Sequence, residues 1–386
     1  MRIGVVKERR PHEARVAVSP ESVKKLAGLG AEIVIEAGAG QGASFADATF
    51  RAAGARIVPD ARAVLREADL VLKVQRPLTA AEGGPDELAM IKRGALLIGM
   101  LAPHAAGDQI AAYAAHGINA FAMEFMPRIT RAQTMDVLSS QSNLAGYRAV
   151  IDAAAEFGRA FPMMMTAAGT VAPARVMVMG AGVAGLQAIA TARRLGAIVS
   201  ASDVRPAAKE QVHSLGAAFV AVEDEEFRQA ETAGGYAKEM SAEYQKKQKA
   251  LIAETIKKQD VVITTALIPG RPAPVLVDEE MVKSMKPGSV IVDLAVEQGG
   301  NCPLSEPGKV TVRHGVKLIG HLNMPSRVPV DSSALYARNL LNFVTLLIDK
   351  ESKALKVDWE DEIIKGTALT RDGAVVHPAF AEGGGR

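Results

Sequence analysis

The chain has 386 residues, of which 48% are hydrophobic and 23% charged, and its formal net charge is +2. This is ordinary for a globular protein of two or three domains, and the charge argues neither for nor against nucleic acid binding. The single cysteine, Cys302, excludes an internal disulfide and disfavours a structural zinc site, which fits a reducing cytoplasm. Charges at positions 7, 9 and 10 argue against a signal peptide, and no apolar run reaches the about 20 residues of a membrane-spanning helix.

Residues 1–137 are predicted to form a first α/β domain. Its expected strands are short apolar runs separated by helical patterns, at residues 2–6, 32–35, 56–58, 69–74, 95–101 and 118–124. Strands that alternate with helices indicate a mostly parallel sheet. A glycine-rich turn at 37–42 follows the second strand, but neither a long apolar helix nor an acidic residue follows it in the expected place. We therefore expect this domain to bind no nucleotide.

Residues 126–143 (MPRITRAQTMDVLSSQSN) form the densest polar cluster of the chain outside the glycine motif described next. They lead into a predicted long helix, 138–157, which would join the two domains. A loop in this position would open onto a ligand cleft, but a helix cap with solvated arginines explains the residues equally well. Sequence chemistry alone leaves the two interpretations even.

The rest of the chain is organised around residues 173–205. An apolar run at 176–179 is followed by Gly180, Gly182 and Gly185 at the spacing G-x-G-x-x-G, then by a helical pattern and a second strand that ends at Asp203. Glycines at these places allow a tight turn, close approach of a pyrophosphate and close packing of helix on strand, and the acid can bind a ribose. The whole unit predicts a dinucleotide site. Asp203 would repel a 2′-phosphate, so NAD(H) is favoured over NADP(H), with Arg205 leaving a minority case for NADP(H).

Further strands of this second domain are expected at 217–220, 260–265, 289–293 and 316–320. The charged segment 223–260 is long for a connection inside a domain and is interpreted as a lid or a mobile insertion. Residues 264–266 and 293–300 lie just past strand ends, on the ligand side of such a sheet. A second long helix, 332–348, is expected to return the chain to the first domain, and residues 359–376 to form a hairpin.

These residues resemble the NAD(H)-binding component, domain I, of proton-translocating nicotinamide nucleotide transhydrogenases. The resemblance covers nearly the whole chain and is carried by KERRPHEARVAVSP (7–20), VLKVQRP (71–77), MPRITRAQTMDVLSSQSNLAGYRAV (126–150), FPMMMTAAGTVAPARVMVMGAGVAGLQAIATARRLGA (161–197), TAGGYAKEM (232–240) and ALIPGRPAP (266–274). It implies an α/β fold of two Rossmann-like domains with mostly parallel sheets joined by long helices. The first would comprise 1–137 plus 332–386, and the NAD(H)-binding domain 138–331, with a mobile loop at about 223–250.

The resemblance also implies the site. Its functional side chains would be Arg128, Gln133, Asp136, Ser139 and Tyr236, the last in a loop that closes over nucleotide. Moving hydride between two nicotinamides needs orientation of the rings and exclusion of water, and no acid or base of the protein. The expected nucleotide-binding residues are Ile129, Thr130, Arg131, Gly180, Gly182, Val183, Ala184, Gly185, Asp203, Val204, Arg205, Gly235, Thr265 and Ala266.

The implied protein is a homodimer that docks on a separate NADP(H)-binding domain and, through it, on a membrane domain that moves protons. It would be cytoplasmic and peripheral on the inner membrane. Two alternatives stay open. Alanine dehydrogenase is similar in architecture, and Arg15 and Lys73 match its carboxylate-binding arginine and catalytic lysine, but its catalytic histidine falls on Ala102 and its aspartate on Glu297. The other alternative is a nucleotide-binding regulator without turnover.

Overall fold

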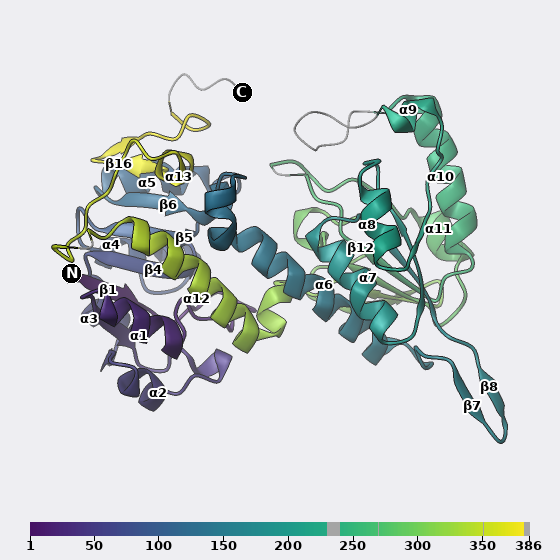
Figure 1. Ribbon diagram of the computed structural model, residues 1–386, viewed down its shortest axis with the longest axis horizontal. Coiled ribbons are helices and arrows are strands. Elements are labelled where there is room, and N and C mark those ends of the chain that lie inside the picture. Colours follow the sequence, from purple (N-terminus) through teal and green to yellow (C-terminus); the bar gives the residue numbers. More distant parts are fainter. Residues whose placement is uncertain (230–239, 269, 350, 382–386) are drawn as a thin grey trace. The chain divides into compact units, whose positions relative to one another are not determined.

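The computed structural model describes residues 1–229, 240–268, 270–349 and 351–381. The chain divides into two compact units, Met1–Gln141 with Ser326–Arg386, and Ser142–Pro325. Each unit is built on one β-sheet with helices on its faces (Figure 1). None of the described helices is long and apolar enough to cross a membrane.

The first unit has a six-stranded, all-parallel sheet in the order β3-β2-β1-β4-β5-β6. Its strands are β1 (Arg2–Val5), β2 (Glu32–Glu36), β3 (Arg56–Val58), β4 (Leu70–Gln75), β5 (Leu96–Met100) and β6 (Asn119–Ala122). Its helices are α1 (Pro20–Gly28), α2 (Asp47–Ala52), α3 (Ala61–Leu65), α4 (Glu87–Met90), α5 (Gly107–Ala115), α12 (Pro329–Leu346) and α13 (Glu362–Thr367). Short 3-10 turns are η1 (Gln41–Ala43), η2 (Ala80–Glu82), η3 (Met123–Phe125) and η4 (Thr130–Met135), and η6 (Met324–Arg327) spans the boundary of the two units.

The second unit has a seven-stranded sheet in the order β11-β10-β9-β12-β13-β15-β14, parallel except for the edge strand β14. Its strands are β9 (Arg175–Met179), β10 (Ile198–Ser202), β11 (Ala218–Phe219), β12 (Val261–Thr264), β13 (Val290–Asp293), β14 (Val310–Arg313) and β15 (Val316–Ile319). Its helices are α7 (Val183–Arg194), α8 (Ala208–Ser214), α9 (Glu225–Arg228), α10 (Ala242–Ile256) and α11 (Glu279–Ser284), with the 3-10 turn η5 (Val296–Gln298). The chain enters this unit along α6 (Val137–Glu156).

The two faces of the second sheet explain the continuous apolar runs of its strands. Successive side chains of a strand point to opposite faces. Val176 and Val178 of β9 therefore pack with α6, α7 and α8, whereas Met177 and Met179 pack with α10 and α11. Because helices cover both faces, the four buried positions of β9, residues 176–179, are all apolar, as expected for a parallel sheet. The predicted α/β class with mostly parallel sheets is confirmed.

Three local expectations were wrong or incomplete. The predicted hairpin at 359–376 is shorter, because Asp361 caps helix α13 and only β16 (Thr370–Arg371) and β17 (Ala374–Val375) pair. The charged segment 223–260 contains helices α9 and α10 where it is described, which the sequence did not predict, and its role as a lid or mobile insertion stays a prediction. The hairpin of β7 (Met164–Thr166) and β8 (Gly169–Val171), which projects from the second unit, was not predicted from the sequence (Figure 1).

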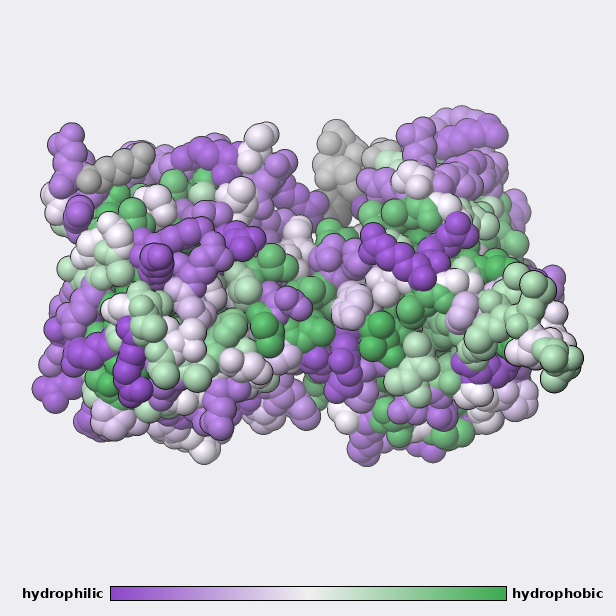
Figure 2. Space-filling model, turned by 60° about the horizontal axis from the view of Figure 1, so that its bottom comes forward, coloured by the Kyte–Doolittle hydropathy of each residue, from purple (hydrophilic) through white to green (hydrophobic). Residues whose placement is uncertain are grey.

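This hairpin exposes apolar side chains. Met163 is 59% exposed, Met164 42% and Met165 79%. The space-filling view shows the projection in pale green, the colour of moderately hydrophobic residues (Figure 2). A two-stranded hairpin is only marginally stable by itself, and these exposed methionine side chains add no buried surface to the unit. Folding of the unit therefore does not require them to be apolar.

Candidate functional site

The strand order of the second sheet sets the position of the glycine turn. The chain continues from β9 to β10 on one side, and β12 lies on the other, so the order reverses between β9 and β12. Ligands of open parallel sheets bind outside the carboxyl ends of the strands at such a point. Gly180 follows β9 and Thr265 follows β12, and the Thr265 hydroxyl donates to the Gly180 carbonyl at 2.9 Å.

Each of the three glycines has a different reason to lack a side chain. Gly180 has φ +100°, and a Cβ there would lie 2.5 Å from the Thr265 hydroxyl. A Cβ on Gly185 would lie 1.8 Å from the Gly180 carbonyl oxygen, so helix α7 can pack on the turn only with glycine there. A Cβ on Gly182 would meet nothing within 4 Å. Packing within the protein thus requires two of the glycines and leaves Gly182 without a structural role of this kind.

Gly182 is the N-cap of α7 and supplies no side-chain cap. The first N–H groups of a helix have no partner inside the helix and carry the positive end of its dipole. Together with the open space at Gly182, this fits a pyrophosphate, because its oxygens can approach the backbone and accept from these N–H groups. Val183 is 41% exposed at the first turn, next to Ala184.

Asp203 follows β10 and faces the same turn. One of its carboxylate oxygens, Oδ2, accepts from the Ala181 N–H at 2.7 Å, and the other, Oδ1, accepts from the Arg205 N–H at 2.8 Å. The Arg205 side chain also pairs with this carboxylate, through Nε at 2.9 Å and Nη2 at 3.0 Å. Val204 between them is 48% exposed. The structure therefore brings the predicted glycines, acid, Thr265 and Ala266 together at one edge of the second sheet.

The predicted polar loop belongs to the first unit. Asp136 directly precedes α6 and accepts from the Ser139 N–H at 2.9 Å and the Ser139 hydroxyl at 2.5 Å. The side chains of Asn339 and Asn342, on α12, both donate to the Thr134 carbonyl, which anchors the turn η4. The helix-cap interpretation is confirmed for Asp136, whereas Arg128 and Gln133 are exposed and the ligand-cleft interpretation stays a prediction.

The remaining loop residues differ in their contacts. Ile129 packs partly buried against the core of the first unit, and Thr130 is exposed. The Arg131 guanidinium makes two hydrogen bonds to Asp361, at 2.7 and 2.8 Å, a pairing that no local pattern predicts across 230 residues. Gly235 and Tyr236 lie outside the described residues.

A cluster of buried charges lies at the reversal point of the first sheet, where β1 and β4 are neighbours. Lys73 is 2% exposed and lies 2.9 Å from Glu87 and 3.1 Å from Glu8. Burial is the largest influence on the pKa of Glu8 and raises it, while the neighbouring carboxylates raise the pKa of Lys73 against the effect of burial. Arg15 is held in a similar way by Glu13 on two nitrogens and by Gln141 on a third. The positive charges of Lys73 and Arg15 are therefore balanced by carboxylates of the same chain.

The loop after β5 contains Ala102 and His104. Ala102 has φ +49°, and its N–H donates to Glu124 at 2.7 Å. Burial raises the pKa of Glu124. The ring of His104 packs against Phe125 and Phe380, with centroids 5.4 and 5.7 Å apart. Across the described parts of the chain, no group of three or more His, Cys, Asp or Glu side chains could hold a metal ion.

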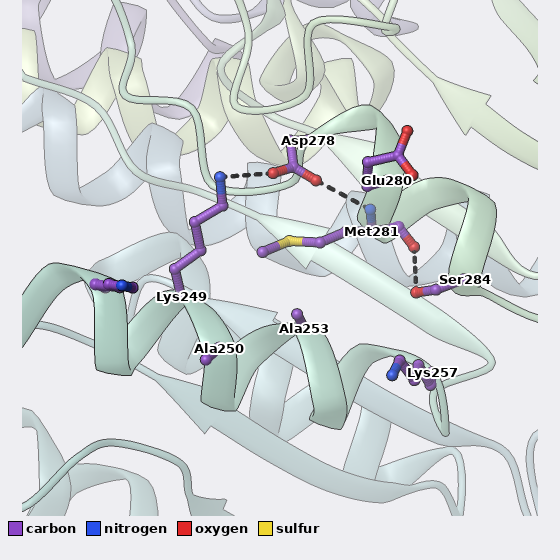
Figure 3. A pocket seen from close by; sticks show the side chains of 9 residues that line it. Lys249, Ala250, Ala253, Lys257, Asp278, Glu280, Met281 and Ser284 are labelled. Carbon is purple, nitrogen blue, oxygen red and sulfur yellow. Dashed lines mark hydrogen bonds and ion pairs between the residues drawn. The ribbon is translucent and has the colours of Figure 1, made fainter.

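A pocket of about 410 Å³ lies elsewhere in the second unit, between α10 and α11 (Figure 3). Its lining residues are Lys246, Lys249, Ala250, Ala253, Lys257, Asp278, Glu280, Met281 and Ser284. Lys249 pairs with Asp278 at 2.7 Å across the pocket. None of the predicted site residues that the structure describes lines it, so the pocket is separate from the glycine turn.

Asn301 organises the ligand edge of the second sheet and was not predicted from the sequence. It is fully buried and bonds to the backbone of Ala266 and Pro274. Its only sequence signal is a position shortly after the polar segment 293–300, which lies past a strand end.

Comparison with known proteins follows the same division of the chain. The family model "Alanine dehydrogenase/PNT, N-terminal domain" matches residues 4–145, and "Alanine dehydrogenase/PNT, C-terminal domain" matches residues 149–378. The chain is 63% identical, over 98% of its length and 99% of the relative's, to the first part of the NAD(P) transhydrogenase subunit alpha of Rhodospirillum rubrum. It is 31% identical, over 99% of its length and 96% of the relative's, to the alanine dehydrogenase of Halomonas elongata. The crystal structure of transhydrogenase from Sinorhizobium meliloti superposes with a TM-score of 0.88 at 56% identity, covering 97% of this chain and all of that one.

Proposed function

The chain belongs to the alanine dehydrogenase/PNT family, and from this premise we propose that it is the NAD(H)-binding catalytic subunit of a proton-translocating transhydrogenase. The observation that carries the proposal is the 63% identity to a transhydrogenase subunit over nearly the whole of both chains. The proposed reaction is direct transfer of hydride from NADH on this chain to NADP⁺ on a partner domain.

The turn at Gly180–Gly185 supports the choice of cofactor. The open space at Gly182 and the uncapped start of α7 would hold the pyrophosphate, and Asp203 would accept hydrogen bonds from the adenosine ribose. The Asp203 carboxylate would repel a 2′-phosphate. The Arg205 guanidinium, which could otherwise bind a 2′-phosphate, is paired with that carboxylate. NAD(H) is therefore favoured over NADP(H) on this chain.

When bound, the nicotinamide supplies the hydride, so this chain needs no acid or base of its own. The proposed work of the protein is to orient the ring and keep water away from it. Arg128 and Gln133 are exposed for such contacts, and the hydroxyl of Ser139 donates a hydrogen bond that orients the Asp136 carboxylate. Tyr236 completes the proposed set.

Alanine dehydrogenase is the second candidate, since relatives of that name match nearly the whole chain. An amino acid oxidation must also move the amine proton. Ala102, at the position that matches the catalytic histidine, carries no titratable group, and Glu297 accepts from the Asn323 N–H at 3.2 Å. Lys73 and Arg15, which pair with Glu87 and Glu13, match residues of the dehydrogenase and do not discriminate between the two candidates. The lack of a titratable side chain at position 102 favours the transhydrogenase assignment.

The proposed assembly is a homodimer, docked on an NADP(H)-binding domain and a proton-translocating membrane domain. The chain would then be cytoplasmic and peripheral on the inner membrane. The name of the Rhodospirillum rubrum relative, which describes it as one portion of a subunit, supports further components. The exposed methionines of the β7–β8 hairpin support a protein interface, because such clusters mark interaction sites.

The test uses the purified full chain in three assays. NADH binding is measured first, and NAD⁺ with L-alanine is then followed for NADH formation. Finally, an NADP⁺-loaded partner domain is added and hydride transfer is measured. We expect binding, no alanine-dependent NADH, and turnover only with the partner. Alanine-dependent NADH would replace the proposal by the dehydrogenase, and binding without turnover under all conditions would favour a regulator.

A further inference from the structure

Asn301 connects the loop after β13 to the loop after β12. Its side-chain oxygen accepts from the Ala266 N–H at 3.1 Å, and its amide nitrogen donates to the carbonyls of Ala266 at 2.9 Å and Pro274 at 2.8 Å. Its own carbonyl accepts from the N–H groups of Leu276 and Val277, at 2.8 and 3.1 Å. A single buried residue thus ties together both ends of the segment that follows β12.

Asp293 holds Asn301 in place. This carboxylate is 1% exposed and accepts from three backbone N–H groups, those of Ala295 and Cys302 at 3.0 Å and of Asn301 at 3.1 Å. Gly300, with φ +79°, allows the tight return of the chain, and a Cβ there would lie 2.8 Å from Asp293. The position of Asn301 is therefore fixed by buried groups of its own loop.

The segment that Asn301 holds borders the glycine turn. Thr265 directly precedes Ala266, and its hydroxyl lies 2.5 Å from the position of a Cβ on Gly180. Beyond Ala266 the chain carries exposed apolar residues, with Leu267 46% and Ile268 44% exposed. The Asn301 side chain bonds both the N–H and the carbonyl of Ala266, so the position of Ala266 at the ligand edge depends on that side chain.

We propose that Asn301 is a positioning residue for the nucleotide, which acts by holding Thr265 and Ala266 against the glycine turn and does not itself touch the ligand. The inference rests on the proposed nucleotide site. A segment ordered before binding spares the ligand the cost of ordering it, so the effect of Asn301 falls on affinity as well as on folding.

The test compares Asn301→Ala and Asn301→Asp in the full chain by NADH titration well below the unfolding temperature. Asp keeps the shape and the acceptor for the Ala266 N–H but loses both donors to carbonyls. Both variants are expected to bind NADH about tenfold or more weakly than the unmodified chain. A residue that only fills space would tolerate Asp, so NADH affinity within twofold of the unmodified chain for a folded Asn301→Asp overturns the proposal.

The matched control is Asn119→Ala, which removes a buried asparagine that accepts from the Asp372 N–H at 2.9 Å in the other unit. Asn119→Ala is expected to lower the free energy of unfolding without changing NADH affinity. If Asn119→Ala loses as much NADH affinity as Asn301→Ala, the effect at Asn301 reflects lost stability alone, which overturns the proposal. If the Asn301 variants do not fold, hydrogen exchange in the unmodified chain without nucleotide decides the matter. The amides of Ala266 and Leu276 are expected to be protected, and exchange at the rate of an open loop contradicts the proposal. Failure of the unmodified chain to bind NADH would instead refute the proposed function.

Discussion

Replacing Gly182 by alanine separates nucleotide binding from folding. The backbone of Gly182 has φ −75° and ψ −168°, which alanine can adopt, and a Cβ there meets nothing within 4 Å. Alanine is a slightly poorer N-cap than glycine but loses less chain entropy on folding. These effects oppose each other, so we expect the free energy of unfolding to change by less than about 1 kcal/mol.

The same methyl group would occupy the space proposed for the pyrophosphate. Pushing the phosphates away from the N–H groups of α7 weakens charge-assisted hydrogen bonds, each contributing about 1.5–3 kcal/mol. The expected loss of NADH affinity in Gly182→Ala is therefore at least about tenfold, since about 1.4 kcal/mol corresponds to a factor of ten. Isothermal titration with NADH, together with urea unfolding of the same sample, measures both quantities.

Gly185→Ala is the matched variant on the same helix. Its Cβ would lie 1.8 Å from the Gly180 carbonyl oxygen, so we expect it to lose stability as well as binding. If Gly182→Ala binds NADH as tightly as the unmodified chain, the pyrophosphate does not approach the backbone at Gly182. That result would refute our placement of the dinucleotide.

Three further variants test other regions of the chain. Lys73→Met should lower the free energy of unfolding by about 3–5 kcal/mol, because it removes the cation that lies between the buried carboxylates of Glu8 and Glu87. Adding Glu87→Gln should restore some of this loss, as measured by urea unfolding. Hydrogen bonds from Arg10 are the largest influence that holds the pKa of Glu82 below its usual range. The ionised Glu82 carboxylate therefore stabilises the folded chain fully above about pH 4.5, and this contribution is lost as the pH falls towards the lower pKa that Glu82 has in the folded chain. Glu82→Gln should make the free energy of unfolding depend less steeply on pH below about pH 4.5. An unchanged slope would contradict the pairing of Glu82 with Arg10. Met165→Glu should shift the proposed dimer towards monomer in light scattering with an unchanged circular dichroism spectrum, whereas an unchanged mass would remove the hairpin from the interface.

The sequence by itself determined the fold class and the family. Buried parallel strands must be apolar on both faces, so the strands predicted at 176–179 and 260–265 were visible without any structure. The glycine spacing and the acid after the next strand are local constraints of one strand-turn-helix unit, so the chain order alone revealed them. The family resemblance, carried by long specific runs, is confirmed by the matches over residues 4–145 and 149–378.

Local patterns failed where the decisive contact is distant in the chain or leaves no period. The turn residues 371–373 predicted a hairpin over 359–376, but the Asp361 carboxylate accepts from the Ile363 N–H and caps a helix there. The hairpin at 164–171 escaped notice because exposed methionines show no alternation between a buried and a solvated face.

The sequence predicted a different role for each glycine of the motif, and the tertiary structure supplied the atoms of Thr265 and of the turn itself that a side chain on Gly180 or Gly185 would meet. The tertiary structure also joined Arg131 to Asp361 and Asn301 to Ala266, across 230 and 35 residues. A side chain that satisfies a buried backbone group leaves no period or spacing in the sequence, since its partner can come from any strand end at the same edge of the sheet. The sequence therefore identified the strands and turn that build the site, while folding decided which side chains hold them in place.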